Sequence, residues 1–129
     1  MSENLNDEPV VVFITARDRS EASRLAEMLV GARFAACVQI LPEMQSVYRW
    51  QGEVHRSSEV LLLAKTVTSR FAELERQVRA LHSYETPEVL AVPASCCSTA
   101  YERWIVETIV GAEASRTITA TTTTAAAHQ

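Results

Sequence analysis

The sequence predicts an α+β fold in which an antiparallel sheet carries two helices on one face. Extended and helical patterns alternate in the order strand, helix, strand, strand, helix, strand, and a shorter helix follows. The apolar stretch from Ala35 to Thr66 predicts an unusually long β-hairpin. The chain has 129 residues, 47% of them hydrophobic, which suits one domain with a real core, expected over residues 9–111. This order is the split βαβ pattern of a ferredoxin-like βαββαβ sandwich, here with a long β-hairpin and an extra C-terminal helix.

The first part of the pattern is a strand followed by a helix. Val10–Thr15 (VVVFIT) is a short apolar run rich in β-branched residues, as in a buried strand. Asp18 and Glu21 have the spacing of a capping box, and apolar residues then recur at helical spacing as far as Gly31. A glycine at this place predicts the end of the helix. Residues 1–8, before the strand, are polar and expected to be flexible.

The hairpin is predicted from two extended limbs. Residues 35–50 form one long, mostly extended limb, residues 51–52 a turn, and residues 59–66 (EVLLLAKT) the antiparallel return. Pro42 has no N–H to donate to a neighbouring strand, so we expect the first limb to bend or bulge there.

The outer half of this hairpin is expected to need a second surface. A small domain cannot easily cover Tyr48 and Trp50 near the tip of so long an arm, and an exposed indole favours packing against another subunit. We therefore expect an oligomer built through strand pairing.

The second half of the chain repeats the alternation. Ser69 is placed to cap a helix that ends at His82, and a proline on each side delimits a strand over residues 88–92. Residues 99–102 have the form of another capping box and predict a short final helix. Residues 112–129 are rich in Ala and Thr without periodicity, and we expect them to be disordered.

Composition excludes several classes of function. The net charge is −4 and no basic run occurs, which argues against nucleic-acid binding. The start lacks the positive region of a signal peptide and no apolar run approaches a membrane span, so a cytoplasmic location is expected. Three glycines, all isolated, exclude a phosphate-binding loop. Three cysteines, an odd number, predict reduced thiols.

Few residues have the chemistry of a site. His82 stands beside Tyr84 and Glu85, and imidazole with carboxylate or thiolate suits copper, although a helix-terminal histidine commonly complements the helix dipole instead. Cys37 with His82 as its base would make a hydrolase, but an apolar strand more commonly buries a thiol as part of its core. The adjacent Cys96 and Cys97 lack the spacing of a zinc site.

Two charged residues flank the apolar run of the return limb. Glu59 and Lys65 stand at either end of VLLLA. They are either solvated strand ends or side chains that face a cleft between subunits.

Four ordered segments resemble one family. AACVQILPEMQSVYRWQGEV, SEVLLLAKT, ALHSYETPEVLAVP and YERWI together are similar to the CutA divalent-cation tolerance family. The resemblance implies a PII-like subunit assembled as a homotrimer, and binding of divalent copper at clefts between subunits. The residues that match the family's cleft positions are Cys37, Trp50, Glu59, Lys65, His82, Tyr84 and Glu85. At Ser83 the family usually has proline.

From the residues and the resemblance we expect a trimeric, non-enzymatic protein of divalent metal response. It would bind copper(II) weakly through His82 with Cys37 or Glu85, and require no cofactor. The alternative is a PII-like regulatory or scaffolding module whose clefts bind a small anion or a partner protein. A cysteine or histidine hydrolase is a third hypothesis.

Overall fold

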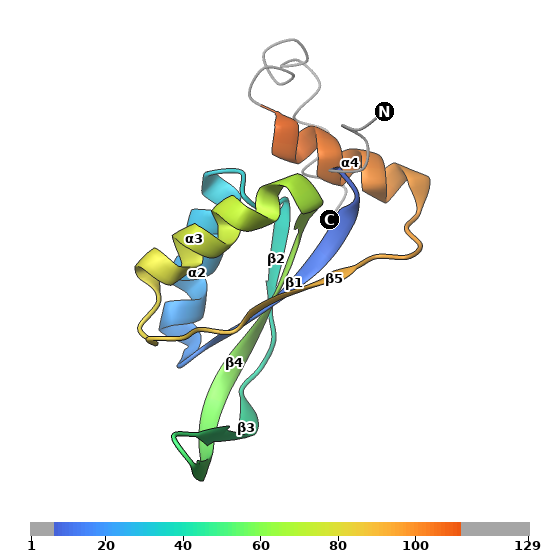
Figure 1. Cartoon of the computed structure of the whole chain (residues 1–129). Coiled ribbons are helices and arrows are strands. Elements are labelled where there is room, and N and C mark those ends of the chain that lie inside the picture. Colours follow the sequence, from blue (N-terminus) through green and yellow to red (C-terminus); the bar gives the residue numbers. More distant parts are fainter. Residues whose placement is uncertain (1–6, 112–129) are drawn as a thin grey trace.

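The computed structural model describes residues 7–111, and this part of the chain has the predicted ferredoxin-like fold (Figure 1). The elements, in chain order, are β1 (Pro9–Ala16), α2 (Arg19–Gly31), β2 (Cys37–Ile40), β3 (Met44–Trp50), β4 (Glu53–Val67), the 3₁₀ turn η1 (Thr68–Arg70), α3 (Phe71–Leu81), β5 (Val89–Pro93) and α4 (Thr99–Val110). Most of the expected flexible start (1–8) and all of the expected disordered tail (112–129) lie outside the described residues. No helix within the described range is long and apolar enough to cross a membrane.

The sheet has the strand order β2-β4-β1-β5, and every strand pair in it is antiparallel. Helices α2 and α3 lie side by side on one face (Figure 1). Alternate residues of a strand point to the same face, so the even-numbered residues of β1 and β4 face these helices. The core between the layers includes Val12, Ile14, Leu62, Ala64, Leu25, Leu29, Leu74 and Val78.

Helix α2 confirms both predicted boundaries. Asp18 is the N-cap, and its side chain accepts a hydrogen bond of 2.9 Å from the backbone N–H of Glu21. Gly31 is the last helical residue, but the left-handed conformation falls at Arg33, with a φ of 64°. Backbone bonds from residues 34 and 35 to the carbonyl of Leu29 close this end of the helix.

The two later cap predictions were wrong in their positions. Helix α3 begins at Phe71 after η1 without a side-chain cap, because Ser69 lies inside η1 and bonds to the Asp7 carboxylate instead. Helix α4 is capped by Ser98, one residue before the predicted position, since Ser98 has the extended backbone that a cap requires and accepts from the N–H of Tyr101.

The hairpin is confirmed and is longer than predicted. Strand β4 has 15 residues, but β1 pairs only with its inner half, from Val60 to Val67, whereas β3 pairs with the outer half. The first limb is interrupted between β2 and β3, around Pro42. Gln51 and Gly52 form the turn with φ values of 51° and 82°. The outer half extends beyond the sheet (Figure 1), and Trp50 in it is 42% exposed.

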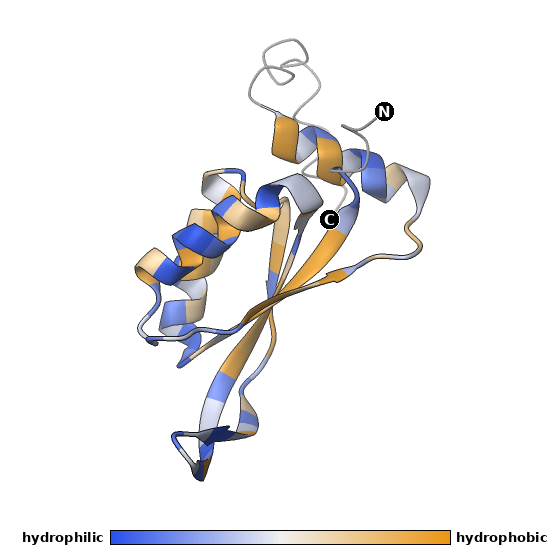
Figure 2. Cartoon of the chain, in the orientation of Figure 1, coloured by the Kyte–Doolittle hydropathy of each residue, from blue (hydrophilic) through white to orange (hydrophobic). Residues whose placement is uncertain are grey.

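The face of the sheet opposite α2 and α3 is apolar and largely uncovered within residues 7–111. Leu90, Phe13 and Leu63 form one row across β5, β1 and β4, and Val92 and Val11 begin the next. Leu90 is 57% exposed. Helix α4 covers only one end of this face, where it packs on Val67. Figure 2 shows the apolar colouring of β1 and the inner half of β4. We call this surface the open face.

Replacing Leu62 by alanine should lower the free energy of unfolding by about 2–5 kcal/mol, because its side chain is fully buried between sheet and helices. Val30→Ala is the matched control, since Val30 is exposed on α2 and the change should stay within about 0.5 kcal/mol. Urea denaturation followed by circular dichroism at one protein concentration measures both. Equal losses would contradict this account of the core.

Candidate functional site

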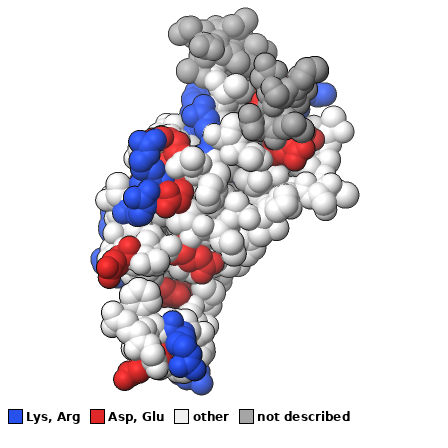
Figure 3. Space-filling view, viewed as in Figure 1, with Lys and Arg blue, Asp and Glu red and all other residues white. Residues whose placement is uncertain are grey.

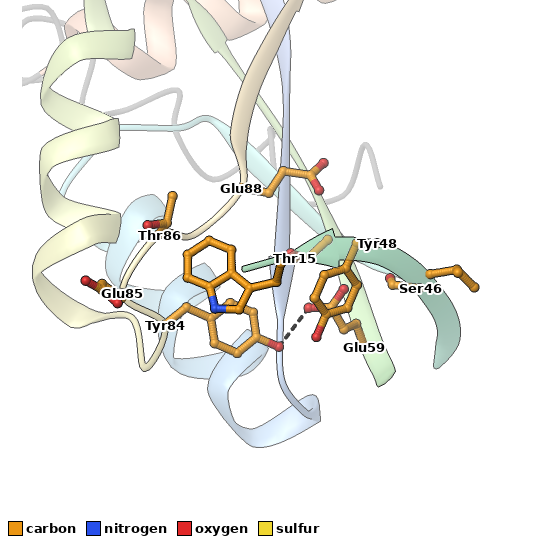
Figure 4. Close-up of a pocket in the computed structure, with 10 residues that line it drawn as sticks. Thr15, Ser46, Tyr48, Glu59, Tyr84, Glu85, Thr86 and Glu88 are labelled. Carbon is orange, nitrogen blue, oxygen red and sulfur yellow. Dashed lines mark hydrogen bonds between the residues drawn. The ribbon is translucent and has the colours of Figure 1, made fainter. Parts of the chain in front are cut away.

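A pocket of about 580 Å³ lies where the hairpin leaves the sheet (Figure 4). Its walls come from β1, β3, β4 and the loop before β5. Three carboxylates and three aromatic rings stand among its lining residues, and no Lys, Arg or His does: Glu59, Glu85, Glu88, Tyr48, Trp50 and Tyr84, together with Thr15 and three others. Red acidic side chains lie between the helices and the hairpin in Figure 3. Odd-numbered Thr15 and Glu59 place the pocket on the open face.

Glu59 is the innermost carboxylate of the pocket. It is the last residue of β4 that pairs with β3, and it is only 7% exposed. The Tyr84 hydroxyl donates to its Oε2 at 2.7 Å, as Figure 4 shows. Burial, and then the hydrogen bond to Glu59 and its charge, raise the pKa of Tyr84 well above the usual value. Tyr84 therefore remains a neutral donor at physiological pH.

Glu88 lies in the same pocket, and none of the described residues that line it is a cation. Burial raises the pKa of its carboxyl, and the negative charge of Glu59 raises it further. The two carboxylates therefore repel each other across the pocket. A bound cation would relieve this repulsion.

His82 lies behind the pocket with both ring nitrogens engaged. Nε2 donates to the Thr15 carbonyl oxygen at 2.7 Å, and the backbone N–H of Tyr84 donates to Nδ1 at 3.0 Å. The His82 side chain has no exposed area. In this arrangement the imidazole offers no lone pair to a metal ion, and it holds Tyr84 in place.

Glu21 supports the loop behind the pocket, a role that sequence reasoning missed. Its carboxylate is 1% exposed and accepts from the backbone N–H of Arg17 at 2.9 Å and of Ser83 at 2.7 Å. His82 Nδ1 lies 3.6 Å from Oε2. Burial acts to raise the pKa of Glu21, but the two backbone donors outweigh it and hold the pKa below the usual value. The capping-box spacing accounts for a glutamate at position 21 through its own helix. It gives no signal of the contact with Ser83, which is 62 residues away in the sequence.

The predicted metal ligands Cys37 and His82 are not brought together within one chain. Cys37 pairs with Lys65, opposite Val11, whereas His82 bonds to Thr15. Four residues along β1 separate these places, about 13 Å. The same separation removes the Cys37–His82 pair that a hydrolase would need.

Cys37 and Lys65 have local partners at the far end of the sheet. Burial raises the pKa of the Tyr101 hydroxyl, and the nearby thiols of Cys37 and Cys97 contribute to the same shift. The Lys65 ammonium donates to the Gln39 side chain at 2.6 Å. The pocket therefore gathers Trp50, Glu59, Tyr84 and Glu85 from the predicted set, without Cys37 or Lys65.

Comparison with known proteins places the chain among divalent-cation tolerance proteins. The sequence profile described as "CutA1 divalent ion tolerance protein" matches residues 10–108. The divalent-cation tolerance protein CutA of Thermus thermophilus is 45% identical over 97 residues, 75% of this chain and 94% of the relative. The chloroplastic protein CutA of Arabidopsis thaliana is 41% identical over 96 residues, 74% of this chain and 53% of that longer protein.

A solved structure supports the same relationship. That of the Thermus thermophilus divalent cation tolerance protein matches with a TM-score of 0.76 at 44% identity, covering 78% of this chain and 97% of the other. Since the Arabidopsis relative is named for the chloroplast, the expected cytoplasmic location stays a prediction.

Proline at position 83 should remove one donor to Glu21. His82 has φ −75° and ψ 148°, a conformation that suits a residue before proline, so Ser83→Pro removes chiefly the N–H. We expect it to lower the free energy of unfolding by about 1–3 kcal/mol. Ser83→Ala keeps the N–H but loses the hydroxyl, which also interacts with Glu21, so it should cost less than Ser83→Pro, and the difference between the two variants is the contribution of the N–H. Chemical denaturation of the two variants measures the difference, and equal stability would show that the bond is unimportant.

Glu21 should make stability depend on pH at the acidic end. Its folded pKa is depressed below the usual 4.5, so its stabilising effect is complete above that value and is lost as pH falls through the folded pKa. Glu21→Gln should be less stable at neutral pH and lose less stability on acidification. Glu75→Gln, which removes an exposed pair with Arg79, is the control and should have a smaller effect. Urea midpoints measured from neutral pH to about pH 3 test this; parallel curves for Glu21→Gln and wild type would contradict it.

Proposed function

The chain belongs to the CutA1 divalent ion tolerance family, and from this premise we propose that it is a homotrimeric binding protein, not an enzyme, for divalent cations. Copper(II) is the cation that we assign first, because among first-row divalent ions it binds a given set of N and O ligands most tightly. The proposed place of binding is the pocket at the base of the hairpin, next to another subunit.

The observation that carries this proposal is the charge of the pocket. Glu59, Glu85 and Glu88 line it, and no basic residue does. Within residues 7–111 no group of three or more His, Cys, Asp or Glu is gathered closely enough to hold a metal ion. A bound copper ion would therefore complete its coordination with water or with another subunit, which fits weak binding.

The open face supports assembly. An apolar sheet surface on which Leu90 is more than half exposed resembles the interior of an obligate interface, which buries about 2,000 Å² or more. Three copies would cover such faces mutually, and the exposed hairpin tips would find a second surface. The pocket stands at the edge of the open face, so a neighbouring subunit would border it.

The carboxylates of the pocket are better placed to bind a metal ion than Cys37 and His82, the ligands expected from the sequence. His82 would have to leave both its hydrogen bonds to bind a metal ion. Cys37 would have to come from another subunit, since it lies at the far end of the sheet. We therefore assign the ligand role to Glu59 and Glu88, whose charges interact across the pocket, and a positioning role to His82.

The alternative of a PII-like module that binds an anion is not favoured here. An anion in this pocket would meet three carboxylates. Lys65, the cation expected to receive it, donates to Gln39 instead.

A lysine on the open face should prevent assembly without unfolding the subunit. Leu90→Lys places a charge at an exposed position that the proposed trimer buries, so analytical ultracentrifugation should show monomers with an unchanged far-ultraviolet spectrum. Val30→Lys, on the outer side of α2, should remain trimeric. Trp50→Ala should weaken assembly through the hairpin tip. A Leu90→Lys trimer, or a wild-type monomer at micromolar concentration, would contradict the proposal.

Neutralising the pocket should weaken copper binding. Calorimetric titration of Cu²⁺ into Glu59→Gln/Glu88→Gln should give an affinity at least about tenfold lower than wild type, because charged ligands are lost. Glu107→Gln, on the exposed side of α4, removes one distant charge and should bind as wild type does. His82→Ala and a variant with all three cysteines replaced by serine complete the set. Loss of binding only in the cysteine-free variant would move the site to the thiols.

A further inference from the structure

The pocket is much larger than a metal ion requires. Its volume of about 580 Å³ lies within the range of small-molecule sites, roughly 300–1,000 Å³. A single water molecule occupies about 30 Å³ in the liquid, so an ion with its hydration shell would leave much of the space to water. The pocket therefore has room for an organic ligand.

Glu59 has one oxygen free for that ligand. Its Oε2 accepts the Tyr84 hydroxyl, whereas no residue in the described part of the chain donates a hydrogen bond to Oε1. The side chain is more than nine-tenths buried. Since no buried side-chain oxygen in residues 7–111 lacks a hydrogen-bond partner, Oε1 is reached by solvent from the pocket, where a ligand N–H⁺ could replace water with a charge-assisted hydrogen bond.

The walls of the pocket suit the rest of an organic cation. Tyr48, Trp50 and Tyr84 present aromatic rings, and ring faces attract ammonium groups and pack against methylene chains. In Figure 4, Glu59 and Glu85 lie on opposite sides of Tyr84, and Glu88 lies apart from both. The negative charges are therefore spread along the pocket.

We propose that this pocket binds an aliphatic diamine or polyamine in its protonated form. One ammonium group donates to Glu59 Oε1, the methylene chain runs along the rings of Trp50 and Tyr84, and a second ammonium group lies near Glu88. The repulsion between Glu59 and Glu88 would be relieved by the same ligand. This inference assigns the pocket a second class of cation beyond the divalent metal of the proposed function, and it does not require copper to bind.

Calorimetric titration of the full chain at neutral pH and low salt tests the proposal. Putrescine and spermidine should bind. Butylamine, with one charge, should bind at least about tenfold more weakly, because it lacks the second ammonium group that would pair with the outer carboxylate of the pocket. Butanediol, a neutral analogue of putrescine, should show no binding. Trp50 gives a second readout, since putrescine should change the fluorescence of a Trp104→Phe variant in which Trp50 is the remaining tryptophan.

Matched variants locate the ligand. Glu59→Gln can still accept the Tyr84 hydroxyl through its amide oxygen, yet it should weaken putrescine binding at least about tenfold. Glu88→Gln, at the more exposed side of the pocket, should also weaken putrescine binding. It replaces Glu59→Gln as the test variant if Glu59→Gln folds poorly. Glu107→Gln removes the same charge at a distant, exposed position and should bind as wild type does.

Three results would overturn the inference: no putrescine binding at about millimolar concentration, equal binding of butanediol, or equal weakening by Glu88→Gln and Glu107→Gln. Copper titration of the same samples separates the two proposals. Copper binding without putrescine binding leaves the proposed function intact and removes only the diamine. The reverse result removes the metal and retains the diamine.

Discussion

Strand β4 is longer than the sheet to which it belongs. Its 15 residues span about 50 Å, and β1 can pair with only the last eight of them. The outer residues must therefore pair with β3 alone and stand away from the core. Glu59 is the last residue of β4 that pairs with β3, and the next residue, Val60, pairs with β1. The pocket exists at this junction because the hairpin diverges there from the sheet and leaves a space that Tyr84 and its loop only partly fill.

The buried polar cluster behind the pocket keeps that loop in place. Glu21 binds the chain at both ends of the cluster, through the N–H groups of Arg17 and Ser83, and His82 joins Thr15 to Tyr84. The side chains and backbone groups of this cluster would be costly to bury without these hydrogen bonds. Proline at position 83 could not donate to Glu21, so this chain relies on a bond that relatives with proline there would lack. The loop that carries Tyr84 is thus held by contacts that lie outside the pocket.

Local patterns in the sequence predicted most of the fold. The element order, the hairpin turn at Gln51 and Gly52 and the interruption near Pro42 follow from periodicity and from proline chemistry, both of which act over a few residues. The caps were misplaced because Ser98 can cap as well as Thr99, and because no local pattern showed that Ser69 lies inside a 3₁₀ turn. The candidate site was predicted in part, since Trp50, Glu59, Tyr84 and Glu85 do meet. The separation of Cys37 from His82 depends on strand register, which no local pattern contains.

In the proposed assembly the hairpin arm has a consequence for cells that carry more than one related chain. Its outer side chains, such as Val47 and Val54, are exposed and contribute little to the core of their own subunit. Substitutions there would leave the stability of the subunit nearly unchanged. Their effect would fall on how well the arm fits the surface of the neighbouring subunit. Two paralogues could then diverge at the arm alone and sort into separate oligomers, with their cores and pockets unchanged.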